Sequence, residues 1–140
     1  MGVPVRIRLL SEDDLPWLTD LCKRRYSDRY DEESTIGWFR NICLKSPLLF
    51  QPIRTDHAFC ITMLSVMPWL PSEWEANVIF ICADRHAGWE PLRLLRALVE
   101  WSRKRKSTYW RICSETDFDL APLAKRVGAK ELSPRFMMRL

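Results

Sequence analysis

The sequence predicts an α+β (mixed α/β) protein in which helices flank a central mixed sheet. Two observations carry this prediction. The chain has 140 residues, 47% of them hydrophobic and 29% charged, which is a globular composition and enough chain for one domain, 1–140, with a sizeable core. Its segments follow the order β-α-α-β-β-β-α-β-α-β, and three consecutive strands followed by alternation indicate a mixed sheet covered by helices.

The N-terminal part is expected to form one strand and two helices. In residues 3–10 the apolar residues alternate and share one face: Val3, Val5, Ile7 and Leu9. A helix is expected over 11–26, because Ser11 can cap its start, acidic residues fill its first turn and basic residues lie at its end. A second helix over 31–47 has an acidic start and an apolar stripe formed by Ile36, Phe39, Ile42 and Cys43.

Three strands are expected in the middle of the chain, over 48–54, 58–66 and 76–82. The sequence "RTDH", residues 54–57, has the composition of a turn between the first two. Residues 67–75 are rich in proline and tryptophan and are expected to form a connection. The third strand is apolar at successive positions, as in a strand buried on both faces.

The C-terminal part is expected to contribute two helices and two strands. Leucines repeat at helical spacing over 89–106, and Pro91 is compatible with the first turn of that helix. A strand is expected over 108–115, followed by a short helix that Asp119 can cap and that Gly128 closes in a left-handed conformation. The chain is then expected to end in a strand over 134–140.

Charge and cysteine usage limit the class of protein. The net charge is +4, and basic residues cluster in three separate elements, which allows an anionic partner but matches no known nucleic-acid-binding motif. The five cysteines contain no Cys-x-x-Cys spacing and several lie in apolar runs, so we expect reduced core thiols, no metal site and a cytoplasmic protein. No apolar stretch is long enough for a membrane span or has the pattern of a signal peptide.

The segment "DRHAGWEPLRLLR", residues 84–96, has two interpretations. A buried strand leads through a loop with Gly88 into a helix, and such a loop can direct several backbone N–H groups and the positive end of the helix dipole at a phosphate. The segment has no Walker A lysine and no Gly-x-Gly-x-x-Gly pattern. On its own it is therefore equally compatible with a simple turn between a strand and a helix.

The order of elements resembles the GCN5-related N-acetyltransferase (GNAT) superfamily over nearly the whole chain, and so implies an acyl-CoA N-acyltransferase-like fold. In that family the fourth strand runs into a pyrophosphate loop, Gln/Arg-x-x-Gly-x-Gly/Ala. Arg85 and Gly88 match this pattern, and Glu90 stands where the family has a small residue. The ending "VGAK", residues 127–130, resembles the family's Leu-Gly-Phe. The segment 87–101 is also similar to acetyltransferase-like proteins of bacteriophages and prophages.

The resemblance implies that acetyl-CoA binds where the fourth and fifth strands separate. Residues 85–91 would then hold the pyrophosphate through backbone N–H groups, and Arg93 would add positive charge, unless it is an ordinary solvated side chain. The end of the fourth strand would pair with the pantetheine amides. The implied cofactor-binding residues are Phe80, Ile81, Cys82, Arg85, His86, Ala87, Gly88, Trp89, Glu90, Pro91 and Arg93.

Acetyl transfer to an amine needs a base for the amine, polarisation of the thioester carbonyl and a leaving thiolate. The candidate bases are Glu73 and Glu75, which precede the third of the three consecutive strands; for either one, a residue in a surface loop is the favoured alternative. Further acidic or polar candidates lie after the fifth strand: Ser114, Glu115 and Asp117. The family's tyrosine acid is absent, because Ala124 occupies its position. Trp69 and Trp74 are candidates for lining an acceptor pocket.

Three classes of function follow. The first is an acetyl-CoA-dependent N-acetyltransferase acting on an unidentified amine, as a monomer or homodimer. The alternative is a catalytically impaired binding or assembly module on the same fold, which the residues at positions 90 and 124, Glu90 and Ala124, favour. The similarity to phage proteins includes a phage-encoded module in this alternative. A nucleic-acid-binding protein ranks third, because the basic residues are dispersed over different elements.

Overall fold

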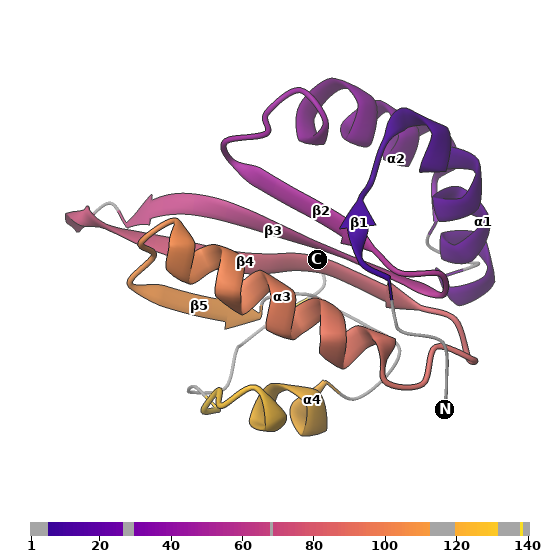
Figure 1. The fold of residues 1–140 in the computed structure, drawn as a ribbon. Helices are drawn as coiled ribbons and strands as arrows, with labels where there is room; N and C mark the ends of the chain where they lie inside the picture. The colour runs from indigo at the N-terminus through magenta and orange to yellow at the C-terminus, as the bar shows by residue number, and fades with distance from the viewer. Residues whose placement is uncertain (1–5, 27–29, 68, 113–119, 132–137, 139–140) are drawn as a thin grey trace.

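The computed structural model describes residues 6–26, 30–67, 69–112, 120–131 and 138, and within them a five-stranded sheet has the order β1-β2-β3-β4-β5 (Figure 1). The strands are β1 (Arg8–Leu9), β2 (Phe50–Arg54), β3 (Ala58–Met67), β4 (Leu70–Ala83) and β5 (Tyr109–Ile112). The first four strands pair antiparallel, and β5 pairs with β4 in parallel. The prediction of a mixed α+β fold is therefore confirmed.

Helices cover both faces of the sheet (Figure 1). On one face lie α1 (Leu15–Tyr26), preceded by a 3-10 turn η1 (Glu12–Asp14), and α2 (Glu32–Trp38), followed by a π-helical turn η2 (Phe39–Cys43). On the other face lie α3 (Glu90–Lys104) and α4 (Ala121–Arg126). No helix in the described part of the chain combines the length and apolar character needed to cross a bilayer.

Alternate residues of the strands build two cores. On the α1/α2 face, Phe59 and Ile61 of β3 pack with Leu18 and other apolar residues of α1. On the α3 face, Cys60 of β3 and Ile81 of β4 pack with leucines of α3. Successive side chains of a strand point to opposite faces of the sheet. The face on which a polar side chain lies can therefore be inferred from the core to which its neighbours in the strand belong.

The fourth strand is longer than the sequence predicted. It begins at Leu70 rather than 76, so the expected connection over 67–75 mostly belongs to the β3–β4 hairpin. The prediction was wrong because prolines and tryptophans indicated a loop, whereas Pro71 lies near the hairpin end, where a strand tolerates proline. β2 in turn begins at Phe50 rather than 48, since the N–H of Phe50 donates to Ser46 O at 3.0 Å.

The second helix also differs from its prediction. It ends at Trp38, and the chain continues as a π-turn in which Leu44 N–H donates to Phe39 O at 2.9 Å. The extra residue in this turn rotates the expected apolar stripe. Phe39 and Cys43 remain buried, whereas Ile42 is 45% exposed.

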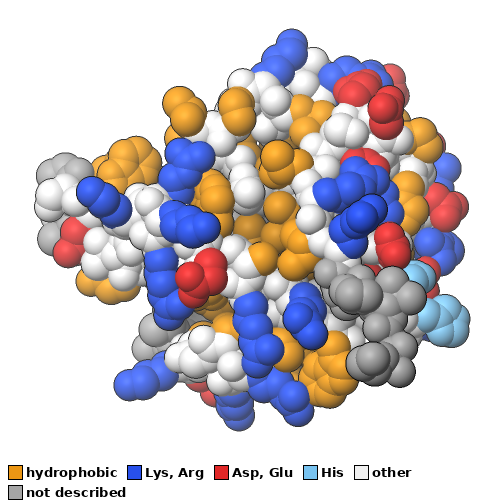
Figure 2. All heavy atoms as spheres, in the orientation of Figure 1, with side chains coloured by type: hydrophobic (Ala, Val, Ile, Leu, Met, Phe, Trp, Pro, Cys, Tyr) orange, Lys and Arg blue, Asp and Glu red, His pale blue; other side chains and the backbone are white. Residues whose placement is uncertain are grey.

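The first strand presents its apolar side chains to solvent. Ile7, which precedes β1, and Leu9 of β1 are 37% and 57% exposed. Ile53 of β2, which pairs with Leu9, is only 4% exposed and packs with leucines of α3, so the uncovered part of this face is limited to the β1 edge. Figure 2 shows apolar side chains at the surface in the middle of this view. Val3, Val5, Asp119 and the expected strand 134–140 lie outside the described residues.

Candidate functional site

Two hydrogen bonds hold the start of the β4–α3 loop, residues 84–89. At its start the Asp84 N–H donates to His57 O at 2.8 Å, and Arg24 Nη1 donates to the Asp84 carboxylate at 2.9 Å. Burial opposes ionisation of Asp84, but the Arg24 hydrogen bond, which has the largest influence, keeps the pKa of this carboxyl below its ordinary value. Gly88 has φ +56°, a conformation that L side chains rarely adopt, so the loop requires glycine here.

The loop leaves a set of backbone donors at the N-terminus of α3. Ala87 N–H donates to Asp84 O and Glu90 N–H to Ala87 O, both at 3.0 Å. Among the described residues, no acceptor meets the N–H groups of Gly88, Trp89 or Leu92. A Cβ placed on Gly88 would meet nothing within 4 Å, so open space adjoins these donors. Donors of this kind at a helix N-terminus suit an anion.

Glu90, the departure from the family pattern, directs its carboxylate toward the β2–β3 turn. His57 donates to it twice, from its backbone N–H at 3.0 Å and from ring Nδ1 at 2.8 Å. Burial tends to raise the pKa of Glu90, but hydrogen bonds from Thr55 and His57 outweigh it and lower that pKa below its ordinary value. The side chain therefore leaves the space beside Gly88 open.

The other loop residues of the implied cofactor site differ in exposure. Arg85, His86, Trp89 and Arg93 are exposed, whereas Ala87 and Pro91 are buried. The guanidinium of Arg126 lies 4.4 Å from the ring centroid of Trp89, which ties α4 to the start of α3. Pro91 has no N–H to offer, so it contributes packing only.

The last part of β4 has no strand on its β5 side within the described residues. The β4–β5 pairing runs only from Glu75 to Val78. Beyond it, a bulge at Ile79 shifts the β3–β4 register, since Thr62 faces Val78 whereas Ile61 faces Phe80. The edge from Ile79 to Ala83 contains the three residues that the resemblance assigns to pantetheine: Phe80, Ile81 and Cys82.

The two candidate bases lie in β4, on the α1/α2 face of the sheet. Val78 packs on the α3 face, so Glu75, three residues earlier in the strand, points the other way. Glu75 is 7% exposed, and its Oε1 lies 3.4 Å from Nε of Arg111 in β5. Glu73 shares this face, and its Oε2 is buried without a hydrogen-bond partner among the described residues. The surface interpretation is thus wrong for Glu75.

Trp74 and the two glutamates cannot line one pocket. Neighbouring residues of a strand point to opposite faces, so Trp74 lies on the α3 side, 39% exposed, and Trp69 is 72% exposed. The position of the missing tyrosine is filled by Ala124 in α4, and the candidates Ser114, Glu115 and Asp117 lie outside the described residues. The sequence did not predict that Arg111 pairs with Glu75 or that His57 pairs with Glu90. For Arg111 the one available signal is the alternation along β5, which places it on the opposite face from Trp110.

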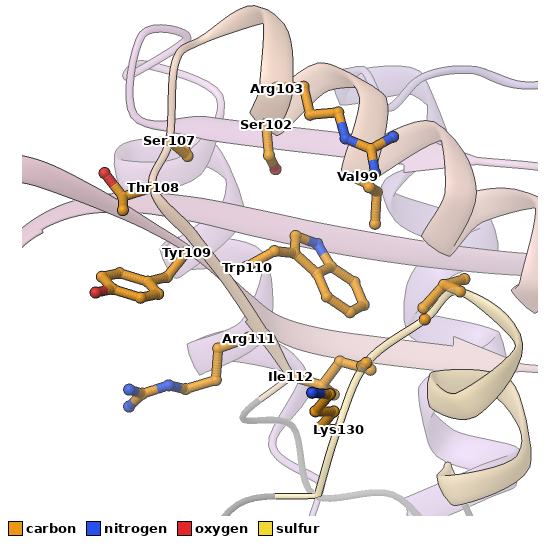
Figure 3. Close-up of a pocket in the computed structure, with 13 residues that line it drawn as sticks. Val99, Ser102, Arg103, Ser107, Thr108, Tyr109, Trp110, Arg111, Ile112 and Lys130 are labelled. Atoms are coloured by element: carbon orange, nitrogen blue, oxygen red, sulfur yellow. The ribbon is translucent and has the colours of Figure 1, made fainter.

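A separate cavity of about 640 Å³ lies between the end of α3, β5 and the segment after α4 (Figure 3). Trp110 and Ile112 line it together with Val99, whereas Tyr109 and Arg111 point away from it, as strand alternation requires. Trp110 Nε1 and Ser107 Oγ are buried there without a partner among the described residues. The cavity lies at the far end of α3 from Gly88.

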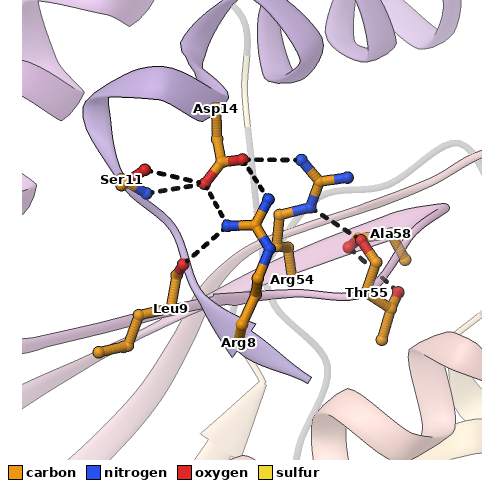
Figure 4. Close-up of polar contacts among 7 residues, drawn as sticks. All are labelled: Arg8, Leu9, Ser11, Asp14, Arg54, Thr55 and Ala58. Atoms are coloured by element: carbon orange, nitrogen blue, oxygen red, sulfur yellow. Dashed lines mark hydrogen bonds and ion pairs between the residues drawn. The ribbon is translucent and has the colours of Figure 1, made fainter. Parts of the chain in front are cut away.

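The densest group of buried charge is structural. Asp14 accepts hydrogen bonds from Arg8, Ser11 and Arg54 and joins η1 to β1 and β2 (Figure 4). The Arg54 guanidinium lies 3.4 Å from the ring centroid of Trp17. The described residues contain no group of three or more His, Cys, Asp or Glu side chains placed to hold a metal ion.

The described fold is that of an acyl-CoA N-acyltransferase-like α+β protein, and comparison with solved structures supports it. A transcriptional regulator from Bacillus halodurans C-125 matches with a TM-score of 0.83 at 14% identity, covering 98% of this chain and 100% of that one. A protein from Clostridium acetobutylicum described as a predicted acetyltransferase, solved with acetyl-CoA, gives a TM-score of 0.73 at 14% identity, covering 97% of this chain and 96% of that one.

A GNAT family acetyltransferase from Staphylococcus aureus gives a TM-score of 0.70 at 14% identity, covering 99% of this chain and 100% of that one. At these identities the likeness establishes the fold alone. No protein-family model matches the sequence. No curated protein matches it either.

Proposed function

We propose that this protein is an acetyl-CoA-dependent N-acetyltransferase whose acceptor is an amine. The observation that carries the proposal is the combination, at one end of β4, of a bulge at Ile79, an edge beyond Val78 and three N–H donors beside Gly88. Solved acetyltransferases that share this fold, one of them with acetyl-CoA, support it.

The chain's own residues fit such a ligand. The N–H groups of Gly88, Trp89 and Leu92 would hold the pyrophosphate, and the exposed Arg85 and Arg93 would add positive charge. The edge from Ile79 to Ala83 would hold the pantetheine amides by main-chain pairing. When bound, acetyl-CoA supplies the thioester carbon to which the amine nitrogen bonds as the C–S bond breaks.

Glu75 is the residue we propose as the base. It would accept the proton that the amine loses, directly or through a water, while Arg111 holds its carboxylate in place at 3.4 Å. Glu73, on the same face with one oxygen free of partners among the described residues, is the second candidate. With alanine at position 124, the thiolate leaves without a tyrosine acid, which a thiol leaving group tolerates better than an amine would.

Two measurements test this function. Acetyl-CoA should raise the melting temperature, because a ligand that binds only the folded state stabilises it by mass action. No shift at millimolar acetyl-CoA would contradict the cofactor assignment. Release of CoA thiol over a panel of amines then tests catalysis.

A binding or assembly module is the second candidate, and Ala124 is the observation that favours it. It predicts a melting shift with acetyl-CoA but no thiol release with any amine.

A further inference from the structure

Glu90, which stands where the family pattern has a small residue, joins the β4–α3 loop to the β2–β3 turn through His57. His57 Nδ1 lies 2.8 Å from Glu90 Oε2, and the His57 N–H donates to Oε1 at 3.0 Å. An ionised carboxylate only accepts hydrogen bonds, so Nδ1 must carry its hydrogen in the neutral ring. The neutral tautomer of His57 is thereby fixed.

Protonation of His57 consequently adds its proton at Nε2 and leaves the link to Glu90 intact. The side chain of His57 is 47% exposed, so Nε2 can reach water, whereas that of Glu90 is 13% exposed. Glu90 stays ionised at mildly acidic pH, because its pKa is lowered. The pair therefore keeps its geometry and changes only its charge, from −1 to zero, as His57 gains a proton.

We propose that the His57–Glu90 pair controls the affinity of the β4–α3 loop for a pyrophosphate group, and that protonation of His57 strengthens this binding. Glu90 is the first residue of α3, next to the free N–H donors of Gly88, Trp89 and Leu92. A lone carboxylate there opposes the positive end of the helix dipole and repels an anion. A protonated His57 cancels that charge. The inference rests on the proposed function, because it concerns regulation of the same site.

The other charged groups around His57 come from each element that packs there. Asp56 adjoins it in the turn, and Asp84 in the loop is paired with Arg24 of α1. The loop also carries Arg85 and the second histidine of the chain, His86, and α3 contributes Arg93. Asp56 is the neighbour of His57 in the same turn and lies outside the implied cofactor site, so Asp56→Asn serves as the matched control.

The test compares CoA affinity at pH 5.5 and pH 8.0 by calorimetry in wild-type protein, His57→Asn and Asp56→Asn. Asparagine places an amide nitrogen where Nδ1 lies, so it can keep the hydrogen bond to Glu90 without titrating. Wild-type protein should lose about fivefold more affinity than His57→Asn on going to pH 8.0, as expected for one nearby charge. Titration of the CoA phosphates cancels in this comparison. Asp56→Asn leaves both histidines in place, so it should keep the pH dependence of wild type.

The reciprocal measurement follows the His57 ring by NMR. Saturating CoA should raise the pH midpoint of His57 titration by about 0.7 units, because linkage makes the two effects equal. The inference is overturned if the CoA affinity of wild type and of His57→Asn depends on pH in the same way and CoA does not move the midpoint of the His57 titration. That result would still leave CoA binding established. If wild-type protein binds no CoA, the proposed function fails, and inorganic pyrophosphate becomes the probe. Pyrophosphate binding with the same dependence on His57 supports the inference, and no binding of either ligand overturns it.

Discussion

Glu75 of β4 and Arg111 of β5 form an ion pair across two parallel strands, with Oε1 and Nε 3.4 Å apart. Glu75 is opposite Tyr109 at the start of the β4–β5 pairing, and Arg111 lies two residues further along β5, one residue before the pairing ends at Ile112. Because Glu75 is 7% exposed, removal of Arg111 would leave a buried carboxylate with fewer partners. The ion pair thus holds a carboxylate in a fixed position beside the edge proposed to bind the cofactor.

Glu75→Gln should lower the rate of acetyl transfer at saturating substrates by about 100-fold, since loss of a positioned base typically costs that much. The affinity for acetyl-CoA should change less than twofold, because Glu75 lies nine residues before Asp84, where the β4–α3 loop begins. Steady-state thiol release and calorimetry measure the two quantities.

Glu73→Gln is the matched variant for this test. It removes the same charge from the same face of β4, two residues away. An equal loss of rate in both variants would show a general effect of charge on the acceptor, and a loss only in Glu73→Gln would reverse the assignment of the base.

Gly88→Ala should weaken acetyl-CoA binding about tenfold and reduce the free energy of unfolding by about 1 kcal/mol. The added Cβ meets nothing within 4 Å, so the cost arises from φ +56° rather than from a clash. The loop backbone of the variant is expected to shift toward a negative φ at position 88, and this shift moves the N–H donors away from the phosphate-binding arrangement. Denaturant unfolding and calorimetry measure the two effects.

The chain provides two control glycines. Gly128 also has a positive φ, +93°, so Gly128→Ala should lose stability without losing affinity. Gly37 lies inside α2 with open space around it, so alanine there should stabilise the protein slightly. If Gly128→Ala weakens binding as much as Gly88→Ala, the effect on the loop is not local.

Local patterns carried most of the fold and part of the site. The loop around Gly88 and the start of α3 were predictable, because a buried strand, a glycine and a proline in the first helical turn are adjacent in sequence. The partners of the site residues were not. Glu90 and His57 are 33 residues apart, and which residue of β5 meets Glu75 depends on the register of a parallel pair. The bulge at Ile79 shifts the register between β3 and β4, and no residue pattern in the sequence signals it.

Native protein should show at most one fast-reacting thiol with DTNB, and five after denaturation. Four cysteines, Cys22, Cys43, Cys60 and Cys82, are buried. Burial raises the pKa of the Cys43 thiol to about 12 and raises that of Cys60 as well, so neither forms the reactive thiolate at pH 8. The fifth, Cys113, lies outside the described residues. Two or more fast thiols would contradict the packing of both cores, and few fast thiols make DTNB suitable for the transfer assay.

Asp14 should make stability depend on pH in the acidic range. Burial tends to raise the pKa of Asp14, but hydrogen bonds from Arg8, Ser11 and Arg54 outweigh it and lower that pKa from 3.8 to about 2. A carboxyl whose folded pKa is depressed stabilises the fold above its unfolded pKa, and this stability is lost as pH falls through the folded value. The shift corresponds to about 2 kcal/mol at neutral pH.

The measurement is urea unfolding of wild-type protein and Asp14→Asn between pH 7 and pH 2. The stability difference should be constant from pH 7 to about 5 and shrink by about 2 kcal/mol toward pH 2, because only the wild type takes up a proton at this site. Glu12→Gln is the control: the Glu12–Arg40 pair has both side chains 53% exposed, so solvent screens it and its loss should leave the free energy of unfolding nearly unchanged. A difference between wild type and Asp14→Asn that stays constant down to pH 2 would show that Asp14 stabilises the β1–η1 junction by shape rather than by charge.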